Sequence, residues 1–401
     1  MKYKLYTIIF ISAIFIGCSS IVKTIIPLSS LPEPSGKYNV GTTQFHWTDK
    51  SRLEWFSEND TTDFRELMVQ IWYPSDEIPA FSPNPYMDNL ELRIPEFSKQ
   101  IGLPKFFINQ ITEIKTQSFQ NLEISDTENS FPVILFSHGL GGMRVQNTSY
   151  IQELVSHGFI VIAMDHTYDA NITIFPNNDI RNYQSDLPKS IKTEEDAFQL
   201  RYKQLKTRTD DIVYILNEFE QLNENPQSQF YNKLKLNNVG IFGHSFGGAT
   251  SVSALYNDSR ITASLALDGW FEILPPEILN NGLAKPFFHL GQEKWDEKLN
   301  YDNRDLLIKN SNGDNWVSTF LESKHFDYMD LPLFTNHTRN FRLTGKIEPF
   351  QFYKCLNEIQ LSFFNYHIKN IGEFNPNLIS GKFPFMIIEK ENISKEFSEI
   401  E

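Results

Sequence analysis

The segment Gly-His-Ser-Phe-Gly at 243–247 constrains the fold more than any other feature of the sequence. It fits the pattern G-x-S-x-G, in which a serine lies on a sharp turn between a strand and a helix. An apolar run at 239–242 precedes the turn, and a helical pattern at 247–256 follows it. We therefore predict that Ser245 is a nucleophile presented at the edge of a sheet. The alternative is a glycine-rich packing turn.

Strand and helix patterns alternate through most of the chain. Short, nearly continuous apolar runs suit strands that are buried on both faces of a parallel sheet. Their alternation with helical patterns predicts an α/β architecture, with a mostly parallel central sheet and helices on both faces. We expect strands at 66–73, 131–136, 159–164, 239–242, 263–267, 286–290 and 316–321, helices at 148–156, 194–222, 247–256 and 351–369, and loops at 171–188 and 275–285.

The segment His-Gly-Leu-Gly-Gly at 138–142 follows one of the expected strands. Acyl transfer creates an oxyanion, which preorganised N–H donors stabilise. A glycine-rich loop after an early strand supplies one donor, and the residue after the nucleophile supplies the other. This nominates the backbone N–H groups of Leu140 and Phe246 as the oxyanion hole. A plain strand-to-helix connection is the alternative.

A nucleophilic serine needs a base, and in this arrangement the base follows the serine and the acid in the chain. Four histidines follow Ser245. His325 lies just after a late strand, where a catalytic imidazole is expected, and His337 is the reserve. His289 falls inside an expected buried strand, and His367 lies on the last helix, where a lone histidine is most often structural.

The base in turn needs a carboxylate that orients it. Asp268 ends the expected strand 263–267 and is the first candidate, whereas Glu293 follows the next strand and is its rival. Asp165 also ends a strand, but it precedes Ser245 and breaks the chain order. No metal-ligand cluster or cofactor motif is visible in the sequence, so we expect a hydrolase without cofactor or metal.

The first 18 residues have the character of an export signal. A cationic start is followed by a short apolar run, too short to span a membrane comfortably, because a span needs about 20 apolar residues. The run ends Phe-Ile-Gly-Cys at 15–18, which resembles the lipobox of bacterial lipoproteins. We expect a signal peptide at 1–17, lipidation of Cys18, and a chain anchored to the bacterial cell envelope. The alternative is an uncleaved anchor with an incidental cysteine.

The remaining chain divides into two expected parts. Residues 18–40 contain several prolines and serines and are expected to form a tether, and residues 41–401 to form one α/β-hydrolase domain with an N-terminal extension. The formal charge is −14, and loss of Lys2 and Lys4 with the signal peptide would make it −16. Such a charge disfavours nucleic acid as a partner and suits neutral or zwitterionic lipid.

One stretch, 94–119, combines apolar residues such as Phe106 and Phe107 with Lys99 and Lys105. It could form an interfacial patch that enters lipid. An ordinary surface element that packs on the core explains the same pattern equally well.

Four blocks together resemble the platelet-activating factor acetylhydrolase family, the lipoprotein-associated phospholipase A2 group. They are Phe-Ser-His-Gly-Leu-Gly at 136–141, Ser-His-Gly-Phe-Ile-Val at 156–161, Gly-His-Ser-Phe-Gly-Gly-Ala-Thr at 243–250 and Leu-Ala-Leu-Asp-Gly-Trp at 265–270. The long expected helix agrees as well, with Arg201, Gln204 and Arg208 at the family's spacing. The resemblance covers roughly residues 65 to 370.

This resemblance implies an α/β-hydrolase fold and a calcium-independent phospholipase A2 that removes short or oxidised sn-2 acyl groups from phospholipids. It makes Ser245 the nucleophile, Asp268 the acid and His325 the base, and it places the oxyanion donors at Leu140 and Phe246. Two other interpretations stay open, namely a carboxylesterase, lipase or polyester-type hydrolase of other esters, and a surface lipoprotein that binds without catalysis.

Overall fold

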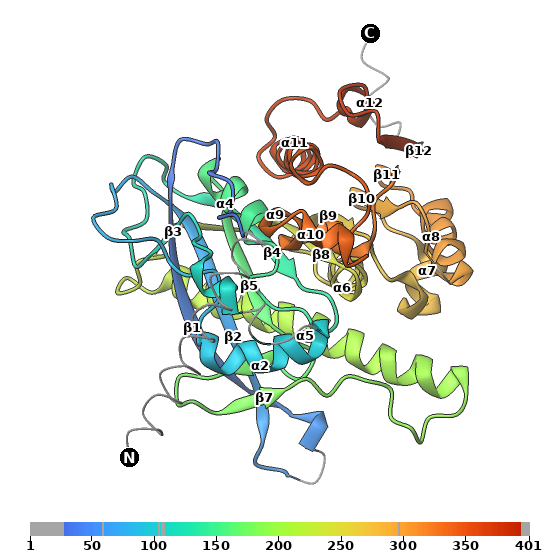
Figure 1. The fold of residues 1–401 in the computed structure, drawn as a ribbon, viewed down its shortest axis with the longest axis horizontal. Helices are drawn as coiled ribbons and strands as arrows, with labels where there is room; N and C mark the ends of the chain where they lie inside the picture. The colour runs from blue at the N-terminus through green and yellow to red at the C-terminus, as the bar shows by residue number, and fades with distance from the viewer. Residues whose placement is uncertain (1–27, 58–59, 103–104, 106–108, 296, 394–401) are drawn as a thin grey trace, which may run out of the picture.

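A ten-stranded sheet organises the protein (Figure 1). The computed structural model describes residues 28–57, 60–102, 105, 109–295 and 297–393. From one edge to the other, the sheet consists of β12 (Met386–Asn392), β11 (Asn315–Phe320), β10 (Phe287–Gln292), β9 (Ile261–Leu267), β8 (Leu234–His244), β4 (Phe131–Ser137), β5 (Ile160–Asp165), β2 (Phe64–Ser75), β1 (Asn39–Leu53) and β3 (Ser118–Gln120).

The central strands of this sheet are parallel. Neighbouring strands from β5 through β4, β8, β9 and β10 to β11 all run in the same direction. Antiparallel strands extend both edges, because β12 pairs with β11 on one side, and β2 and β1 follow β5 on the other. Every residue of β4 and β5 is buried, as expected of apolar strands covered on both faces. The predicted mostly parallel α/β architecture is therefore confirmed.

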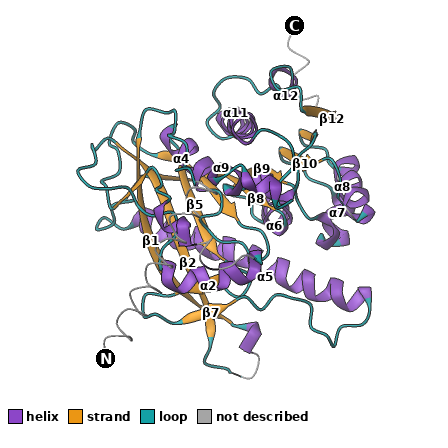
Figure 2. Ribbon diagram, viewed as in Figure 1, coloured by secondary structure: helices purple, strands orange, loops and turns teal. Residues whose placement is uncertain are grey.

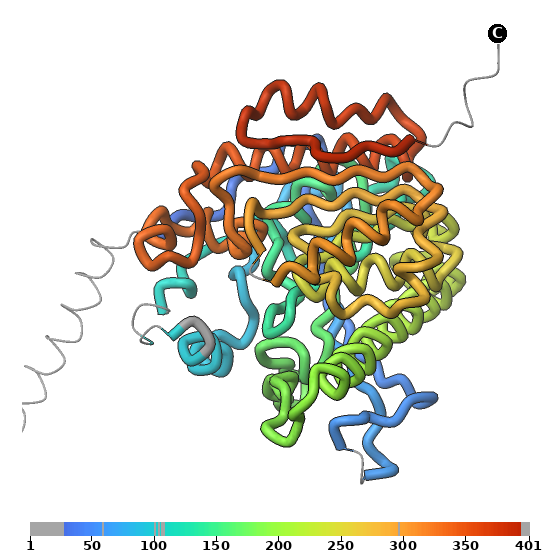
Figure 3. Tube along the Cα trace, turned by 90° about the vertical axis from the view of Figure 1, so that its right-hand side faces the viewer, coloured from blue at the N-terminus to red at the C-terminus, as the bar shows by residue number. Residues whose placement is uncertain are grey.

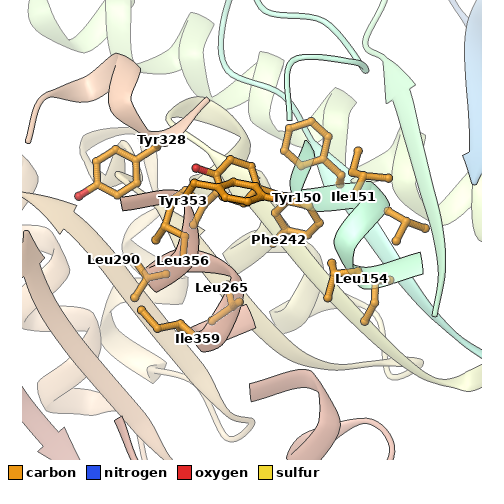
Figure 4. Close-up of a cluster of buried hydrophobic side chains, with 14 of the residues drawn as sticks. Tyr150, Ile151, Leu154, Phe242, Leu265, Leu290, Tyr328, Tyr353, Leu356 and Ile359 are labelled. Carbon is orange, nitrogen blue, oxygen red and sulfur yellow. The ribbon is translucent and has the colours of Figure 1, made fainter. Parts of the chain in front are cut away.

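Helices cover both faces of the sheet (Figure 2). On one face, α4 (Thr148–Ser156) and α11 (Pro349–His367) pack against each other and against the central strands. Figure 4 shows this core, in which Tyr150 of α4 lies beside Tyr353 of α11, with ring centres 5.3 Å apart. The other face carries α5 (Glu194–Glu224), α6 (Phe246–Asn257), α7 (Pro276–Asn281) and α8 (Lys298–Asn310).

Two segments that were expected to be loops contain regular structure. Within 171–188, β6 (Ile172–Ile174) and β7 (Ile180–Asn182) form a small antiparallel pair. This correction reflects burial, because all three β6 residues lie inside the protein although the stretch as a whole is rich in Asn and Pro. Within 275–285, α7 begins with Pro276 at a first-turn position, where proline is tolerated.

The N-terminal segment 28–38 has no helix or strand, yet it packs on the domain. Leu31 is only 3 % exposed, and the Ser29 N–H donates to the Phe334 carbonyl at 2.8 Å. The Ser35 N–H donates to Glu153 on α4 at 2.9 Å. Apolar burial and hydrogen bonds therefore already hold the described part of the expected tether, 28–38, on the surface of the domain.

Several expectations fall on residues that the structure does not describe. The signal at 1–17 and the lipidation site Cys18 lie outside the described residues, and so do Phe106 and Phe107 of the 94–119 stretch. The described part of that stretch includes most of α2 (Leu90–Ile101). Among the described helices, none combines the length and apolar character needed to cross a membrane.

Figure 3 shows the later strands side by side, with the chain's last helices along one edge. Because β4, β8, β9, β10 and β11 are parallel, their carboxyl ends all meet at one edge of the sheet. Loops that follow these strands are brought together there, which is where open α/β sheets hold their sites.

Candidate active site

Ser245 lies on a tight turn between β8 and α6. Its backbone has φ 60° and ψ −120°, a conformation that costs free energy for a residue with a side chain. The turn is sterically closed to larger residues, because a Cβ atom on Gly243 would lie 2.0 Å from the Gly247 carbonyl oxygen. A Cβ on Gly247 would lie 2.0 Å from the Ser137 carbonyl oxygen. The predicted strand, turn and helix around Ser245 are thus present.

Asp268 and His325 are joined by a short hydrogen bond. Asp268 follows β9, and its Oδ2 lies 2.5 Å from Nδ1 of His325, which follows β11. The carboxylate is 1 % exposed, and its Oδ1 accepts a second hydrogen bond from the Gln292 N–H at 3.0 Å. Because the carboxylate accepts from Nδ1–H, the single proton of the neutral imidazole is on Nδ1. Nε2 is therefore unprotonated and can act as the base.

Ser245 and His325 border the same two hollows. Within the described residues, no hydrogen bond joins the Ser245 hydroxyl to the His325 imidazole. Catalytic hydrogen bonds are often long in a free enzyme and tighten when substrate binds. The structure thus brings the three predicted residues to one edge of the sheet, with the acid and base already paired.

The loop that carries His325 is fixed by Asp327 and Asp330. Asp327 Oδ2 accepts from the backbone N–H groups of Lys324 and Gly345, each at 2.7 Å. Burial raises the pKa of Asp327 to about 6. Asp330 is fully buried and accepts from the Ser149 hydroxyl and N–H, and burial raises its pKa to about 7. These carboxylates anchor the loop on both sides of the imidazole.

His244, the residue before the nucleophile, also contacts the base. Its Nε2 lies 2.9 Å from the His325 carbonyl oxygen, which can only accept, so Nε2 carries the proton. Nδ1 then accepts from the side-chain amide of Gln146 at 3.2 Å. Burial, followed by the charge of His325, holds the pKa of His244 well below its usual value, so this ring stays neutral.

The predicted oxyanion loop lies against the nucleophile. A Cβ on Gly139 would be 3.3 Å from the Ser245 Cβ. Two of the loop's N–H groups are used, because Gly141 donates to the Asp169 carbonyl and Gly142 to the Gly139 carbonyl. The Leu140 N–H makes no hydrogen bond among the described residues. Phe246 is the first residue of α6, and the first N–H groups of a helix have no partner within the helix.

Two hollows of different character meet at Ser245. One is a pocket of about 170 Å³ with a mostly apolar lining, which includes Leu140, Met143 and Phe334. The other is open, measures about 860 Å³, and is bordered by Trp270, Trp295 and several charged side chains. The charged residues around the open hollow are Glu293, Lys294, Glu297, Glu322, Lys324, Arg342 and Lys346.

The rival residues lie in other settings. Glu293 is exposed and accepts from the Glu322 N–H. His337 contacts Asn340 on α10 (His337–Asn340). His289 is buried and lies against Phe271, whereas His367 is half-buried beside Phe363. Within the described ranges, no group of three or more His, Cys, Asp or Glu side chains could hold a metal ion.

Sequence reasoning missed the supporting residues around the base. His244 was seen only as the variable position of the motif, and Gln146 and Asp327 were assigned no role. The polar residue before the nucleophile is the one signal that could have identified His244. Gln146 carries no such signal, because it reaches His244 from 98 residues away.

With this geometry in view, the comparisons with known proteins identify the family. The family model of platelet-activating factor acetylhydrolase, isoform II, matches residues 24–381. The chain belongs to this family. The platelet-activating factor acetylhydrolase of Bos taurus is 25 % identical over 396 residues, covering 88 % of this chain and 81 % of that protein. The protein of the same name from Cavia porcellus is 24 % identical and covers 92 % and 84 %, respectively.

One of the solved structures has a fold similar to that of this acetylhydrolase family member. A ferulic acid esterase from Streptomyces cinnamoneus superposes with a TM-score of 0.72 at 22 % identity, covering 90 % of this chain and 99 % of the esterase. Together with the parallel sheet, this confirms the predicted α/β-hydrolase fold. The family membership confirms that the chain is an ester hydrolase. A serine mechanism is consistent with the hydrolase fold.

Proposed function

We propose that this esterase hydrolyses short sn-2 acyl groups of glycerophospholipids. The observation that carries the proposal is the position of Ser245, beside the paired Asp268 and His325, where a small apolar pocket meets a larger, open hollow bordered by charged side chains. A phospholipid with a short sn-2 acyl chain has two matching parts, because its ester joins a small apolar acyl group to the larger remainder with the charged head group. The names of the relatives support this substrate class.

The reaction uses the three residues in turn. Ser245 Oγ attacks the ester carbonyl while His325 Nε2 takes its proton, and Asp268 holds the resulting imidazolium in place. The N–H groups of Leu140 and Phe246 stabilise the oxyanion. His325 then gives the proton to the leaving lysophospholipid oxygen, and the same base activates the water that releases the acyl group.

The pocket size favours short acyl chains. Its volume of about 170 Å³ is below the ~300–1,000 Å³ of pockets that enclose drug-sized ligands. Met143, Leu331 and Phe334 are among the side chains that line it. A long acyl chain would have to displace these side chains, whereas an acetyl or butyryl group would not.

Turnover of matched lipids tests the proposal. We expect the purified chain to release acetate from a 2-acetyl phosphatidylcholine much faster than oleate from its 2-oleoyl counterpart. A Phe334→Ala variant, which enlarges the pocket by removing a lining side chain, should make the ratio of the two rates smaller. Equal rates on both lipids would contradict the short-acyl proposal, and activity confined to simple soluble esters would favour a carboxylesterase.

Covalent labelling separates any hydrolase from a binding protein. A fluorophosphonate should label the wild-type chain at Ser245 and leave a Ser245→Ala variant unlabelled. Absence of labelling in folded wild-type protein would favour a non-catalytic lipoprotein.

We also propose that the chain is exported and anchored to the bacterial cell envelope by a lipid on Cys18. The signal pattern and the residues Phe-Ile-Gly-Cys at 15–18 support this. A Cys18→Ala variant expressed in bacteria should lose incorporation of labelled palmitate and leave the membrane fraction. Equal membrane association of the two forms would contradict the anchor.

A further inference from the structure

Arg208 on α5 contacts both segments that carry the oxyanion donors. Its side chain is fully buried, and its Nη1 donates to the His138 carbonyl at 2.7 Å, at the start of the oxyanion loop. The guanidinium carbon also lies 4.5 Å from the centre of the Phe246 ring, within the range of a cation–π contact. One side chain therefore touches the loop before Leu140 and the residue after the nucleophile.

Asp169 completes the arrangement from the other end of the loop. Its Oδ2 accepts from Arg208 Nε at 2.5 Å, and its side chain is almost fully buried. Its own backbone carbonyl accepts from the Gly141 N–H at 2.8 Å. The Arg208–Asp169 pair thus holds the loop on both sides of Leu140, at His138 and at Gly141.

His138 fixes the peptide group between these two points. The His166 backbone N–H can only donate, and it lies 3.0 Å from His138 Nε2, so that nitrogen accepts and the proton is on Nδ1. Nδ1–H then donates to the Gly139 carbonyl at 2.6 Å. This carbonyl belongs to the same peptide group as the Leu140 N–H. A hydrogen bond to the carbonyl end both orients and polarises that N–H.

We propose that Arg208, paired with Asp169, is a positioning residue that aligns the Leu140 and Phe246 halves of the oxyanion hole. The inference rests on the proposed serine-esterase function, but not on the identity of the ester. Stability alone is a weak reason for such a pair, because replacing a buried ion pair by apolar residues is often neutral or stabilising. An oxyanion hole, in contrast, acts only when its donors are aimed at the developing charge.

The test compares Arg208→Lys with Arg65→Lys, using p-nitrophenyl acetate as the substrate. Arg65 is a matched control, because it is equally buried, pairs with Asp211 and Glu54, and donates to a backbone carbonyl, but contacts neither the loop nor Phe246. Lysine keeps the positive charge at either position but lacks the planar set of N–H donors of the guanidinium group. We expect kcat of Arg208→Lys to fall about 10- to 100-fold with KM little changed, because small misplacements of catalytic groups cost this much. Arg65→Lys should keep its kcat within about threefold, with any loss confined to thermal stability.

Inactivation by a fluorophosphonate provides a second readout. The phosphonyl oxygen occupies the same hole, so the rate constant for labelling of Ser245 should fall in parallel with kcat in Arg208→Lys. Asp169→Asn, which keeps the shape of the side chain, should change both rates in the same direction by a smaller factor, and it serves if Arg208→Lys does not fold. Unchanged kcat in folded variants, or a rise in KM alone, would overturn the inference. A wild-type chain without turnover of any ester would instead contradict the proposed function.

Discussion

In the part of the chain that the structure describes, two sets of one Ser, one His and one Asp can be compared, and they differ in their access to solvent. In the first, Asp268 pairs with His325 beside Ser245 at the edge of two hollows. In the second, the Ser137 hydroxyl lies 3.0 Å from His166 Nε2, and His166 Nδ1 lies 2.9 Å from Asp211 Oδ2. The second set is entirely buried.

The surroundings of the two acids explain the difference in role. Asp268 accepts only from His325 and one backbone N–H in the hydrogen bonds described above, whereas Asp211 also binds Arg65 and Arg52. Burial opposes ionisation of Asp211, but these two cations outweigh it and hold its pKa well below the usual range. Burial also lowers the pKa of His166 to about 4. The three residue types alone therefore do not make a nucleophile, because a strained turn and access to substrate are needed as well.

Ser245→Ala should have the largest effect on rate. Removing the nucleophile of a serine hydrolase lowers kcat by on the order of 10⁶-fold, and only the first set should respond in this way. Steady-state hydrolysis of p-nitrophenyl acetate measures the loss, with thermal unfolding as the control for folding. Retention of substantial esterase activity would place the nucleophile elsewhere.

Replacing each acid by Asn should affect different properties, namely kcat for Asp268 and the free energy of unfolding for Asp211. Asp268→Asn should reduce kcat about 10⁴-fold while the fold persists, because the amide favours the wrong imidazole tautomer. Asp211→Asn should instead cost about 3–5 kcal/mol of unfolding free energy, because it leaves two buried arginines undercompensated. Urea unfolding and steady-state kinetics on both variants make the comparison. A large loss of kcat with unchanged stability in Asp211→Asn would contradict the distinction between a catalytic Asp268 and a structural Asp211.

Acid should reveal the buried set through stability. The folded-state pKa of His166 is about 4, below its ordinary value of 6.5, so the unfolded chain binds the extra proton. The contribution of this neutral imidazole is complete above pH 6.5 and is lost as the pH falls toward 4. The loss amounts to about 3 kcal/mol, at roughly 1.4 kcal/mol for each pKa unit. A His166→Gln variant should show a correspondingly flatter dependence of unfolding free energy on pH, and identical slopes would contradict the assignment.

Ser137→Ala should have the smallest effect. It removes one neutral hydrogen bond to His166 and should lower the free energy of unfolding by about 1–3 kcal/mol. We expect kcat to stay within about threefold of wild type, since the backbone that supports the oxyanion loop is unchanged. A rate loss comparable to that of Ser245→Ala would mean that the buried set takes part in catalysis.

The first set could be predicted from sequence because its signals are local. Ser245 lies in a short motif, and Asp268 and His325 each follow an apolar strand in the expected chain order. Chain order alone does not separate Asp268 from Glu293, however, and the family resemblance favours Asp268. The buried set has no such signature, since Asp211 appears in the sequence only as one polar residue of a long helix. Its partner Arg65 lies 146 residues away, on β2. Such pairings depend on how distant segments meet.

Two strands in the outer parts of the sheet, β1 and β12, were missed for a related reason. β1 mixes polar and aromatic residues, and its middle is only partly buried, so neither alternation nor a continuous apolar run marks it. β12 is similar, because its apolar start at Met386–Ile388 is followed by charged residues, of which Glu389 and Glu391 are exposed. Both strands are defined by pairing with strands already in the sheet rather than by their own pattern.

The N-terminal segment on the domain surface determines where a membrane attachment would leave the body. Ser29 is hydrogen-bonded to Phe334, and Phe334 lines the acyl pocket. Were Cys18 acylated as proposed, the eleven residues from Cys18 to Leu28 could span at most about 35–40 Å when fully extended. Such a short tether would be attached on the side of the molecule that carries the acyl pocket. It would keep the esterase within about one protein diameter of the bilayer. Substrate could then be taken from the lipid surface in the molecule's immediate neighbourhood.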